Sequence, residues 1–455
     1  MANDVSFLSI AELIRSYRDR SLSPVDVAEA FFGRIERLDG ELHSYVEITR
    51  DLALAQAREA ERNYASGNTS AALAGVPISI KDAFHIAGVP TTLGSDMYRG
   101  LVAKGDSGLV RRLRASGAVF LGKTNTAEFG QSATTDNMLG PDTANPWDIT
   151  RTSGGSSGGA AASVAARLTT VAVGSDGGGS IRIPAAFSGI FGLKPSPGLC
   201  KDESGFRAMT EFVSAGPMAR SVADARILLG VLADATFERG TDKRPLRVCY
   251  CPAPENRPVD PGVAALVESA ARSFESLGHY VEKDHPPIEG WGDIFGPLVL
   301  EEEHRERGHL LKLCSERLTR YERSALEAAL AMDPAAVRRA RELLPGFRSR
   351  LAAFFERYDI VLTPATAVPP FPLGERPEFI HDVAVDWLWG AFPFAAPFNV
   401  GGVAASAVPC GLVGGLPVSV QVVAAAGAER LLLDISQDFE EAIAFDRGKL
   451  DSMWS

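Results

Sequence analysis

The stretch from about residue 124 to residue 200 carries few charged side chains and consists largely of Gly, Ser, Thr and Ala. Two short segments stand out within it: 154–159 reads Gly-Gly-Ser-Ser-Gly-Gly, and 176–182 reads Asp-Gly-Gly-Gly-Ser-Ile-Arg. Glycine makes up 44 of the 455 residues, about 10% against an average near 7%. This excess indicates tight turns or sites that are lined by backbone.

Regular structure is predicted between the two glycine–serine segments. An alanine-rich run at about 160–167 predicts a helix, and 169–174 predicts the strand that follows it. The 24 residues from Ser156 to Ser180 are enough for a loop, a helix and a strand to return the chain to one edge of a sheet. The two serines are therefore candidates for a shared site.

Short β-rich runs alternate with helical patterns along the rest of the chain. Ser23 followed by Pro24 is typical of a helix start, with a hydroxyl cap before a proline at the first helical position. Further helices are predicted at about 106–116 and 432–439, and further strands at 75–80, 118–121, 359–363 and 416–423. We find no fixed-period repeat and no obvious linker, so the sequence predicts one α/β domain rather than several.

The composition excludes several classes of protein. Apolar residues make up 45% and charged residues 23% of the chain, which is typical of a globular protein and excludes disordered and fibrous chains. The net charge of −11 argues against binding to nucleic acid or to an anionic membrane surface. The first ten residues lack the basic and apolar runs of a signal peptide, so we expect a cytoplasmic protein.

Two further features have simple structural interpretations. Residues 387–428 carry no charged side chain, but prolines and glycines interrupt this stretch and favour buried strands and turns over a membrane helix. Five cysteines are present, an odd number with irregular spacing. Cys249 and Cys251 have no second pair and no nearby histidine, so we expect buried reduced thiols rather than a zinc site.

Two motif matches have to be weighed against the surrounding sequence. Residues 117–124 satisfy the phosphate-loop pattern, but their central Ala-Val-Phe-Leu is typical of a strand and not of an open phosphate cradle. Residues 154–158 satisfy G-x-S-x-G, the nucleophile elbow, which needs a histidine base further along the chain. None of the downstream histidines lies in a recognisable motif: His279, His285, His304, His309 and His381.

What remains is a pair of serine-bearing glycine loops and one lysine, Lys81, after a short predicted strand. Successive small residues at 177–180 can aim several backbone N–H groups at one point, as a tetrahedral oxyanion requires. The same glycines are also compatible with a turn that packs under a helix. From the loop alone both interpretations stay open.

Taken together with their flanking motifs, these residues resemble the amidase signature family. Lys81 in Gly-Val-Pro-Ile-Ser-Ile-Lys-Asp and the two glycine–serine segments occur in the order and spacing of that family. Its flanking landmarks are matched by Gly122-Lys-Thr-Asn125, Glu128-Phe129, Asn145-Pro-Trp147, residues 216–222, Val408-Pro-Cys-Gly411, Gly415-Leu-Pro-Val418 and Gln421. The departures, which affect the shape of the pocket rather than the reactive positions, are Ser153, Val403, Ser419 and the segment 201–213.

The resemblance implies a single domain, 1–455, with a mixed, twisted central β-sheet flanked by helices on both faces. Within it the resemblance implies a catalytic core at about 70–230 and a helical, pocket-forming region at about 255–355, followed by C-terminal strands and a helix at about 356–445. It also implies a hydrolase that acts on linear carboxamides and needs no metal and no organic cofactor.

The resemblance further implies a Ser–cis-Ser–Lys triad. Ser180 is then the nucleophile that forms the acyl-enzyme, Ser156 the bridging serine after a cis peptide bond, and Lys81 the base. Backbone N–H groups form the oxyanion hole, and we expect Ser157 to hydrogen-bond Lys81. The remaining implied residues are Gly177, Gly178, Gly179 and Ser180 for the oxyanion hole, and Asp176 and Arg182 either as loop-ordering groups or as a buried ion pair without a catalytic part.

A lysine can act as the base only when its amine is neutral. At the ordinary pKa of about 10.4, roughly one amine in 2,500 is neutral at pH 7. Burial can lower the pKa of a lysine by the roughly three to four units that are required. Apolar neighbours surround Lys81 in the sequence, namely Ile78, Ile80, Ala83 and Phe84. We therefore expect the Lys81 amine to be buried and largely neutral.

Three functions follow as alternatives. The first is a stand-alone amidase for a small carboxamide, with a small-molecule substrate, no nucleic acid or membrane partner, and a homodimer left open. The second is the glutaminase (A-type) subunit of a tRNA-dependent amidotransferase; the apolar, aromatic run at 385–394 differs from the Tyr-x-x-Asp segment associated with that role and argues against it. The third, a non-catalytic relative, is disfavoured by the intact Lys81, Ser156 and Ser180.

The sequence leaves the substrate pocket open. The charged helical region at 260–355 and four aromatic residues are candidates to line or cover it, and ordinary core packing is the alternative. The four aromatic residues are Trp387, Trp389, Phe392 and Phe394.

Overall fold

The structure, a computed structural model, describes residues 4–68, 70–203, 205, 207–241 and 244–454. The α-helices are α1 (Ile10–Arg18), α2 (Pro24–Leu42), α3 (Arg50–Ala65), α4 (Gly108–Ala115), α5 (Gly158–Ala165), α6 (Arg182–Ser188), α7 (Val222–Ala233), α8 (Pro261–Ser276), α9 (Trp291–Arg307), α10 (Leu310–Cys314), α11 (Arg320–Leu330), α12 (Pro334–Arg357), α13 (Ala396–Val400), α14 (Glu429–Ile443) and α15 (Gly448–Met453).

The β-strands are β1 (Tyr45–Ile48), β2 (Pro77–Lys81), β3 (Val119–Thr124), β4 (Ala144–Asn145), β5 (Asp148–Thr152), β6 (Val171–Asp176), β7 (Phe191–Lys194), β8 (Ser214–Ala219), β9 (Arg247–Tyr250), β10 (Tyr280–Lys283), β11 (Ile360–Pro364), β12 (Phe379–Ile380), β13 (Val383–Ala384), β14 (Ala404–Val413) and β15 (Leu416–Ala424).

One mixed sheet organises the chain. Across the described residues it has 11 strands in the order β1-β3-β2-β6-β8-β7-β14-β15-β11-β9-β10. The strands β3, β2 and β6 run parallel to one another, as do β11, β9 and β10 at the other end, and antiparallel pairs join the two groups. Because β2 and β6 are parallel neighbours, their carboxyl ends lie at the same edge of the sheet.

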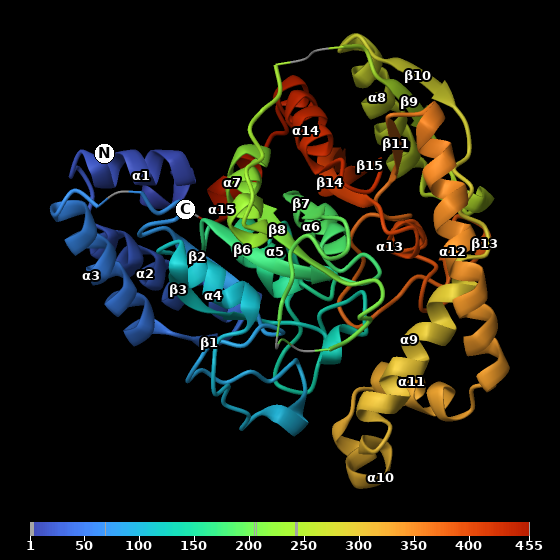
Figure 1. The fold of residues 1–455 in the computed structure, drawn as a ribbon, viewed down its shortest axis with the longest axis horizontal. Helices are drawn as coiled ribbons and strands as arrows, with labels where there is room; N and C mark the ends of the chain where they lie inside the picture. The colour runs from blue at the N-terminus through green and yellow to red at the C-terminus, as the bar shows by residue number, and fades with distance from the viewer. Residues whose placement is uncertain (1–3, 69, 204, 206, 242–243, 455) are drawn as a thin grey trace.

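Helices pack on both faces of this sheet (Figure 1). Gly192 of β7 pairs with Ala407 of β14, and a Cβ at Gly192 would meet Ala185 of α6, so this face carries α6 and its neighbour α5. The next residue along β14, Ser406, points to the opposite face because strand side chains alternate. There its hydroxyl hydrogen-bonds that of Ser436 in α14, on the side that also carries α7 and α8.

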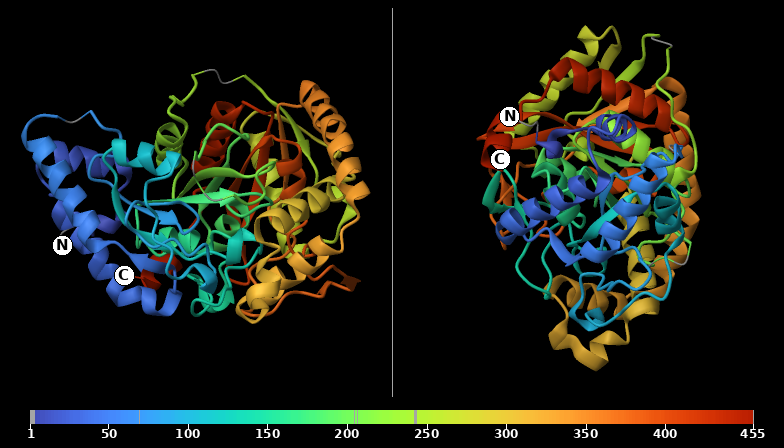
Figure 2. Two further views of the ribbon diagram at one scale, coloured as in Figure 1. Left: turned by 60° about the horizontal axis from the view of Figure 1, so that its bottom comes forward. Right: turned by 90° about the vertical axis from the view of Figure 1, so that its left-hand side faces the viewer.

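The predicted fold class is confirmed: the protein is a single domain with a mixed central sheet and flanking helices. The strands expected near 75–80, 118–121, 169–174, 359–363 and 416–423 are β2, β3, β6, β11 and β15, each displaced by no more than a few residues. The expected alanine-rich helix is α5. Figures 1 and 2 show α1–α3 at one end of the long axis and α9–α12 at the other.

The uncharged segment 387–428 is part of the sheet. It forms α13, β14 and β15, and most of its residues are buried, as expected for strands and turns. Among the described residues, no helix combines the length and the apolar character that crossing a bilayer requires. The five cysteines are free and buried, as the sequence predicted.

Candidate active site

Lys81 is the last residue of β2, and the neighbouring strand β6 ends with Ser175 and Asp176. The pairing of Ile80 with Val173 sets these two strand ends side by side. Both strands are buried before these positions and mostly apolar, apart from Ser79, whose hydroxyl pairs with that of Tyr45. The sheet therefore delivers an amine, a hydroxyl and a carboxylate to one edge.

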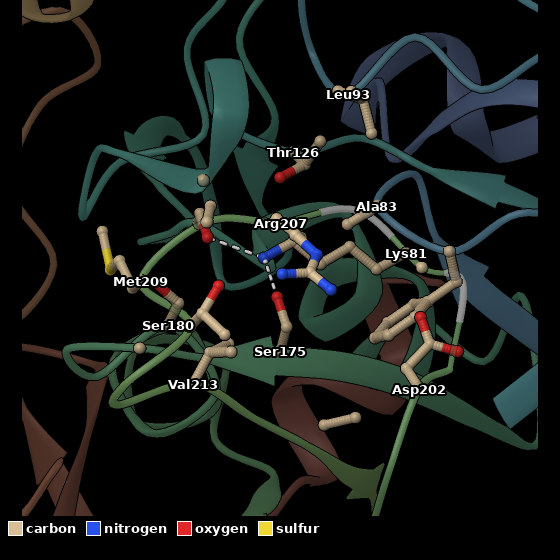
Figure 3. Close-up of a pocket in the computed structure, with 18 of the residues that line it drawn as sticks. Lys81, Ala83, Leu93, Thr126, Ser175, Ser180, Asp202, Arg207, Met209 and Val213 are labelled. Carbon is tan, nitrogen blue, oxygen red and sulfur yellow. Dashed lines mark hydrogen bonds between the residues drawn. The ribbon is translucent and has the colours of Figure 1, made fainter. Parts of the chain in front are cut away.

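The Lys81 amine is buried and makes two short contacts. The residue is 0% exposed, and its Nζ lies 2.6 Å from Ser156 Oγ and 2.9 Å from Ser175 Oγ. Burial lowers the pKa of Lys81 to about 7, although the carboxylate of Asp176 opposes the shift. Figure 3 shows the Lys81 amine and the Ser180 hydroxyl facing the same space. The lysine is buried, as the sequence predicted, and with this pKa about half of its amine is neutral at pH 7.

Ser156 lies in the loop before α5, and its peptide bond with Gly155 is cis, as expected. A Cβ at Gly155 would lie 2.5 Å from the backbone of Thr134, so glycine is required here by close approach. The Ser156 carbonyl accepts hydrogen bonds from the Ala127 N–H and the Thr135 hydroxyl, both at 3.3 Å. These contacts fix the loop beneath the lysine.

The expected contact between Ser157 and Lys81 is wrong. The Ser157 hydroxyl donates instead to the carbonyl of Ser175 at 3.2 Å, and the Ser175 side chain takes the place beside the lysine. The reason is the strand register, which sets Ser175 directly beside the end of β2. Sequence reasoning missed Ser175, although its position next to Asp176 at the end of a predicted strand was a usable signal.

Ser180 follows the glycine run and precedes α6. Its side chain is 9% exposed, and its carbonyl accepts a hydrogen bond from the Ser157 N–H at 3.1 Å. The Asp176 carboxylate holds the loop in place, because it accepts hydrogen bonds from the N–H groups of Gly179 at 2.7 Å and Ile181 at 3.2 Å. The Gly179 N–H is thus already engaged, so the expectation that it serves the oxyanion hole is wrong.

Three predicted N–H donors stay available. In the described part of the chain, the N–H groups of Gly177, Gly178 and Ser180 donate to no protein acceptor. Gly179 itself has a φ of +127°, a conformation that favours glycine, and a Cβ there would meet Ile183 and Ala395. The loop is therefore shaped by Gly179, while its neighbours present their N–H groups.

Asp176 and Arg182 form a buried ion pair behind this loop. Both side chains are 0% exposed, with Arg182 Nη2 and Asp176 Oδ1 2.8 Å apart. Burial alone would raise the pKa of Asp176, but Arg182, Lys194 and Asn399 together outweigh it and hold that pKa below its usual range. Arg182 also donates to Gln421 at 2.6 Å and to the Ala395 carbonyl at 2.9 Å, which ties the loop to β15 and to the segment before α13.

The reactive side chains open into one cavity of about 420 Å³. Lys81, Ser156, Ser175 and Ser180 line it together with apolar and charged residues from several segments. The other lining residues are Ala83, Phe84, Leu93, Thr126, Phe129, Gly130, Gly177, Gly198, Cys200, Lys201, Asp202, Glu203, Gly205, Arg207, Ala208, Met209, Thr210, Val213 and Ala215.

The residues expected to line this cavity from 260–355 and from the aromatic run do not do so. Phe392 and Phe394 are buried in the core, and Trp387 is 42% exposed beside a separate small cavity. Trp389 packs with Phe295 against the outside of Gly178, because a Cβ there would meet both rings. Core packing was the better interpretation of these aromatic residues. Within 260–355, α9 supports the cavity wall from behind, since its Arg307 and Glu302 hydrogen-bond the backbone of residues 207 and 210.

No three metal-ligating side chains cluster anywhere in the described ranges.

Comparison with known proteins gives a consistent result. The family model described as Amidase matches residues 26–433. The A-type subunit of a glutamyl-tRNA(Gln) amidotransferase from Carboxydothermus hydrogenoformans is 32% identical, covering 98% of this chain and 99% of the relative. An acylamidase from Rhodococcus erythropolis is 32% identical, covering 96% of each.

A solved bacterial aryl acylamidase, described as one of the amidase signature (AS) enzymes, superposes with a TM-score of 0.88 at 27% identity and covers 98% of both chains. The family model spans nearly the whole chain, and the overall fold is that of the solved relative. The chain therefore belongs to the amidase signature family of hydrolases.

Proposed function

We propose that this protein is an amidase that hydrolyses a small carboxamide to a carboxylic acid and ammonia or an amine, through an acyl-enzyme on Ser180. The observation that carries the proposal is the buried Lys81 amine, 2.6 Å from Ser156 Oγ, in the cavity that Ser180 also lines. A serine hydroxyl needs a base to become nucleophilic, and a buried amine with a pKa of about 7 is such a base.

In the first step Ser180 Oγ attacks the amide carbon. Its proton passes to Ser156, whose own proton passes to the neutral Lys81 amine. The Ser175 hydroxyl oxygen accepts a hydrogen bond from that amine at 2.9 Å, which leaves the nitrogen lone pair directed at Ser156. The carbonyl oxygen becomes an oxyanion, and the N–H groups of Gly177, Gly178 and Ser180 are the donors that stabilise it.

Collapse of the tetrahedral intermediate breaks the carbon–nitrogen bond. The proton held on Lys81 returns through Ser156 to the departing nitrogen, which leaves as ammonia or an amine. Water then attacks the Ser180 ester and gives up a proton along the same path. The carbon–oxygen bond to Ser180 breaks, the acid is released, and all three side chains regain their starting protonation.

A fluorophosphonate probe tests the nucleophile. We expect covalent labelling of Ser180 in the intact protein, loss of labelling in Ser180→Ala, and loss of amide hydrolysis in the same variant. Ser188→Ala is a matched control, because Ser188 is equally small and buried but lies at the far end of α6. Labelling at another residue, or an active Ser180→Ala protein, contradicts the proposal.

A glutaminase subunit of an amidotransferase is the second candidate. It is favoured by the 32% identity over 98% of this chain with a relative that carries the name of such a subunit. The apolar run at 385–394 supports the first candidate instead. Assay of the purified chain alone separates them: turnover of simple amides without added subunits supports the amidase, whereas glutamine turnover that requires partner subunits supports the alternative.

A further inference from the structure

One segment supplies about half of the cavity lining. The described residues of 198–215 contribute Arg207, Met209 and Val213, among others, to the cavity wall. The same segment includes 201–213, where the sequence departs from the usual pattern of the family. The inference that follows rests on the proposed function.

Arg207 brings a positive charge to the cavity. Figure 3 shows its guanidinium turned into the space that Lys81 and Ser180 face. In the part of the chain that the structure describes, no carboxylate pairs with it. The two acidic residues of the wall are engaged elsewhere, since Asp202 accepts the Leu109 N–H at 2.9 Å and Glu203 pairs with Arg112 at 3.4 Å.

The backbone of this arginine is held from behind by α9. Arg307 donates from Nη1 to the Arg207 carbonyl at 3.0 Å, and the Glu303 carboxylate in turn binds the Arg307 guanidinium. Three residues further, the Glu302 carboxylate accepts the Thr210 N–H at 2.7 Å. Both ends of 207–210 are thus fixed. A fixed backbone lowers the cost of ordering the guanidinium around a ligand.

Arg207 is exposed, and the cavity lining mixes apolar side chains with the charged Lys201, Asp202 and Glu203. The apolar side chains of the lining are Phe84, Leu93, Phe129, Met209 and Val213. Electrostatic attraction is stronger beside apolar groups than in bulk water. The planar guanidinium fork matches a carboxylate with two parallel hydrogen bonds. A cavity of about 420 Å³ holds a short chain between the two groups.

We propose that the substrate is a small amide that also carries a carboxylate, separated from the amide carbon by a short apolar chain, and that Arg207 binds this carboxylate. Arg207 is then a specificity-determining residue, while Lys81, Ser156 and Ser180 carry out the hydrolysis.

The test compares matched substrates. Succinamate and glutaramate carry the carboxylate, and succinamide and glutaramide replace it by a neutral amide of the same shape. We expect wild-type kcat/KM to favour the carboxylates at least tenfold after allowance for the two amides of each diamide. In Arg207→Gln this ratio falls at least tenfold, mainly through KM, and Arg207→Lys restores part of it.

Lys201→Gln is the matched control, because it removes a positive charge from an exposed position of the same wall. We expect it to change the ratio less than threefold. An unchanged ratio in Arg207→Gln, or an equal effect of Lys201→Gln, overturns the inference. Neither result touches the proposed function, which fails separately if the wild-type protein hydrolyses none of the four amides or if Ser180→Ala still does.

Discussion

Replacing Ser175 by alanine removes one of the two partners of the buried Lys81 amine and leaves the other in place. Lys81 Nζ lies 2.9 Å from Ser175 Oγ and 2.6 Å from Ser156 Oγ, and the lysine is 0% exposed. Ser175→Ala thus isolates the hydrogen bond that orients the base from the one that carries the proton.

The size of the effect follows from the energy of one hydrogen bond. A neutral hydrogen bond contributes about 1 kcal/mol net, which corresponds to roughly a fivefold loss of kcat. The protonated amine loses more, about 1.5 kcal/mol or above, because hydrogen bonds to charged groups are stronger. The difference disfavours the charged form, so the pKa of Lys81 falls from about 7 to a lower value.

The assay is a pH profile of kcat and KM on a simple neutral amide. For Ser175→Ala we expect a roughly fivefold lower kcat on the plateau, an almost unchanged KM, and an acid limb displaced to lower pH by a few tenths of a unit or more. Ser157→Ala is the matched control, because the Ser157 hydroxyl donates to the Ser175 carbonyl and not to the lysine.

Two results refute this reasoning. One is a Ser157→Ala protein whose acid limb moves further than that of Ser175→Ala, which would mean that Ser157 rather than Ser175 contacts the amine. The other is a Ser175→Ala protein whose kcat falls while its acid limb stays in place. That combination would show that the serine supports the fold of the site and does not act on the charge of Lys81.

Three further predictions test other parts of the site. Wild-type kcat/KM rises with pH through about 7, because the lowered pKa of Lys81 makes its amine neutral above that value, and Lys81→Ala loses about 100-fold or more of the rate together with this limb. Asp176→Asn leaves the buried Arg182 without its charge partner, so denaturant titration should show unfolding that is easier by about 3–5 kcal/mol; a change below about 1 kcal/mol would contradict the buried pair. Gly155→Ala places a methyl group 2.5 Å from the Thr134 backbone and should destabilise by about 1–3 kcal/mol, whereas Gly33→Ala, in open space within α2, should stabilise by about 0.5–1 kcal/mol in the same thermal melts; equal melting temperatures would argue against the close approach.

Local sequence signals predicted the strands and the position of the lysine well. The β-rich runs before Lys81 and Asp176 are buried on both faces of the sheet, so they are short and mostly apolar, and Lys81 and Asp176 mark their ends. The roles of the two serines and the cis peptide bond were predicted only from the resemblance to the amidase signature family, because composition and spacing alone left them open. The position of Ser175 at the end of a predicted strand made it a candidate, but its contact with Lys81 depends on the register of two strands whose contacting residues are 94 positions apart, which the sequence does not give.

The same limit explains the error at Gly179. A run of three glycines predicts that several N–H groups can point at one place. It does not tell which of these N–H groups are already hydrogen-bonded within the protein. Which N–H groups are engaged depends on the orientation of the Asp176 carboxylate. Arg182 and Asn399 fix this orientation, and Asn399 Nδ2 donates a hydrogen bond to Asp176 Oδ1 at 2.9 Å. A residue more than 200 positions away in the sequence therefore decides which backbone groups stay available.

The aromatic residues show how packing and chemistry are divided at this site. A run of aromatic side chains predicts burial, but the sequence does not tell whether these side chains contact the substrate or pack against the rest of the protein. Trp389 and Phe295 press on Gly178 from outside, with their rings 3.3 Å and 3.1 Å from the place a Cβ would take. They exclude any larger residue at 178 and hold the loop against the sheet. The described residues of 198–215 line the cavity instead, and they bring Arg207 to it together with Met209 and Val213.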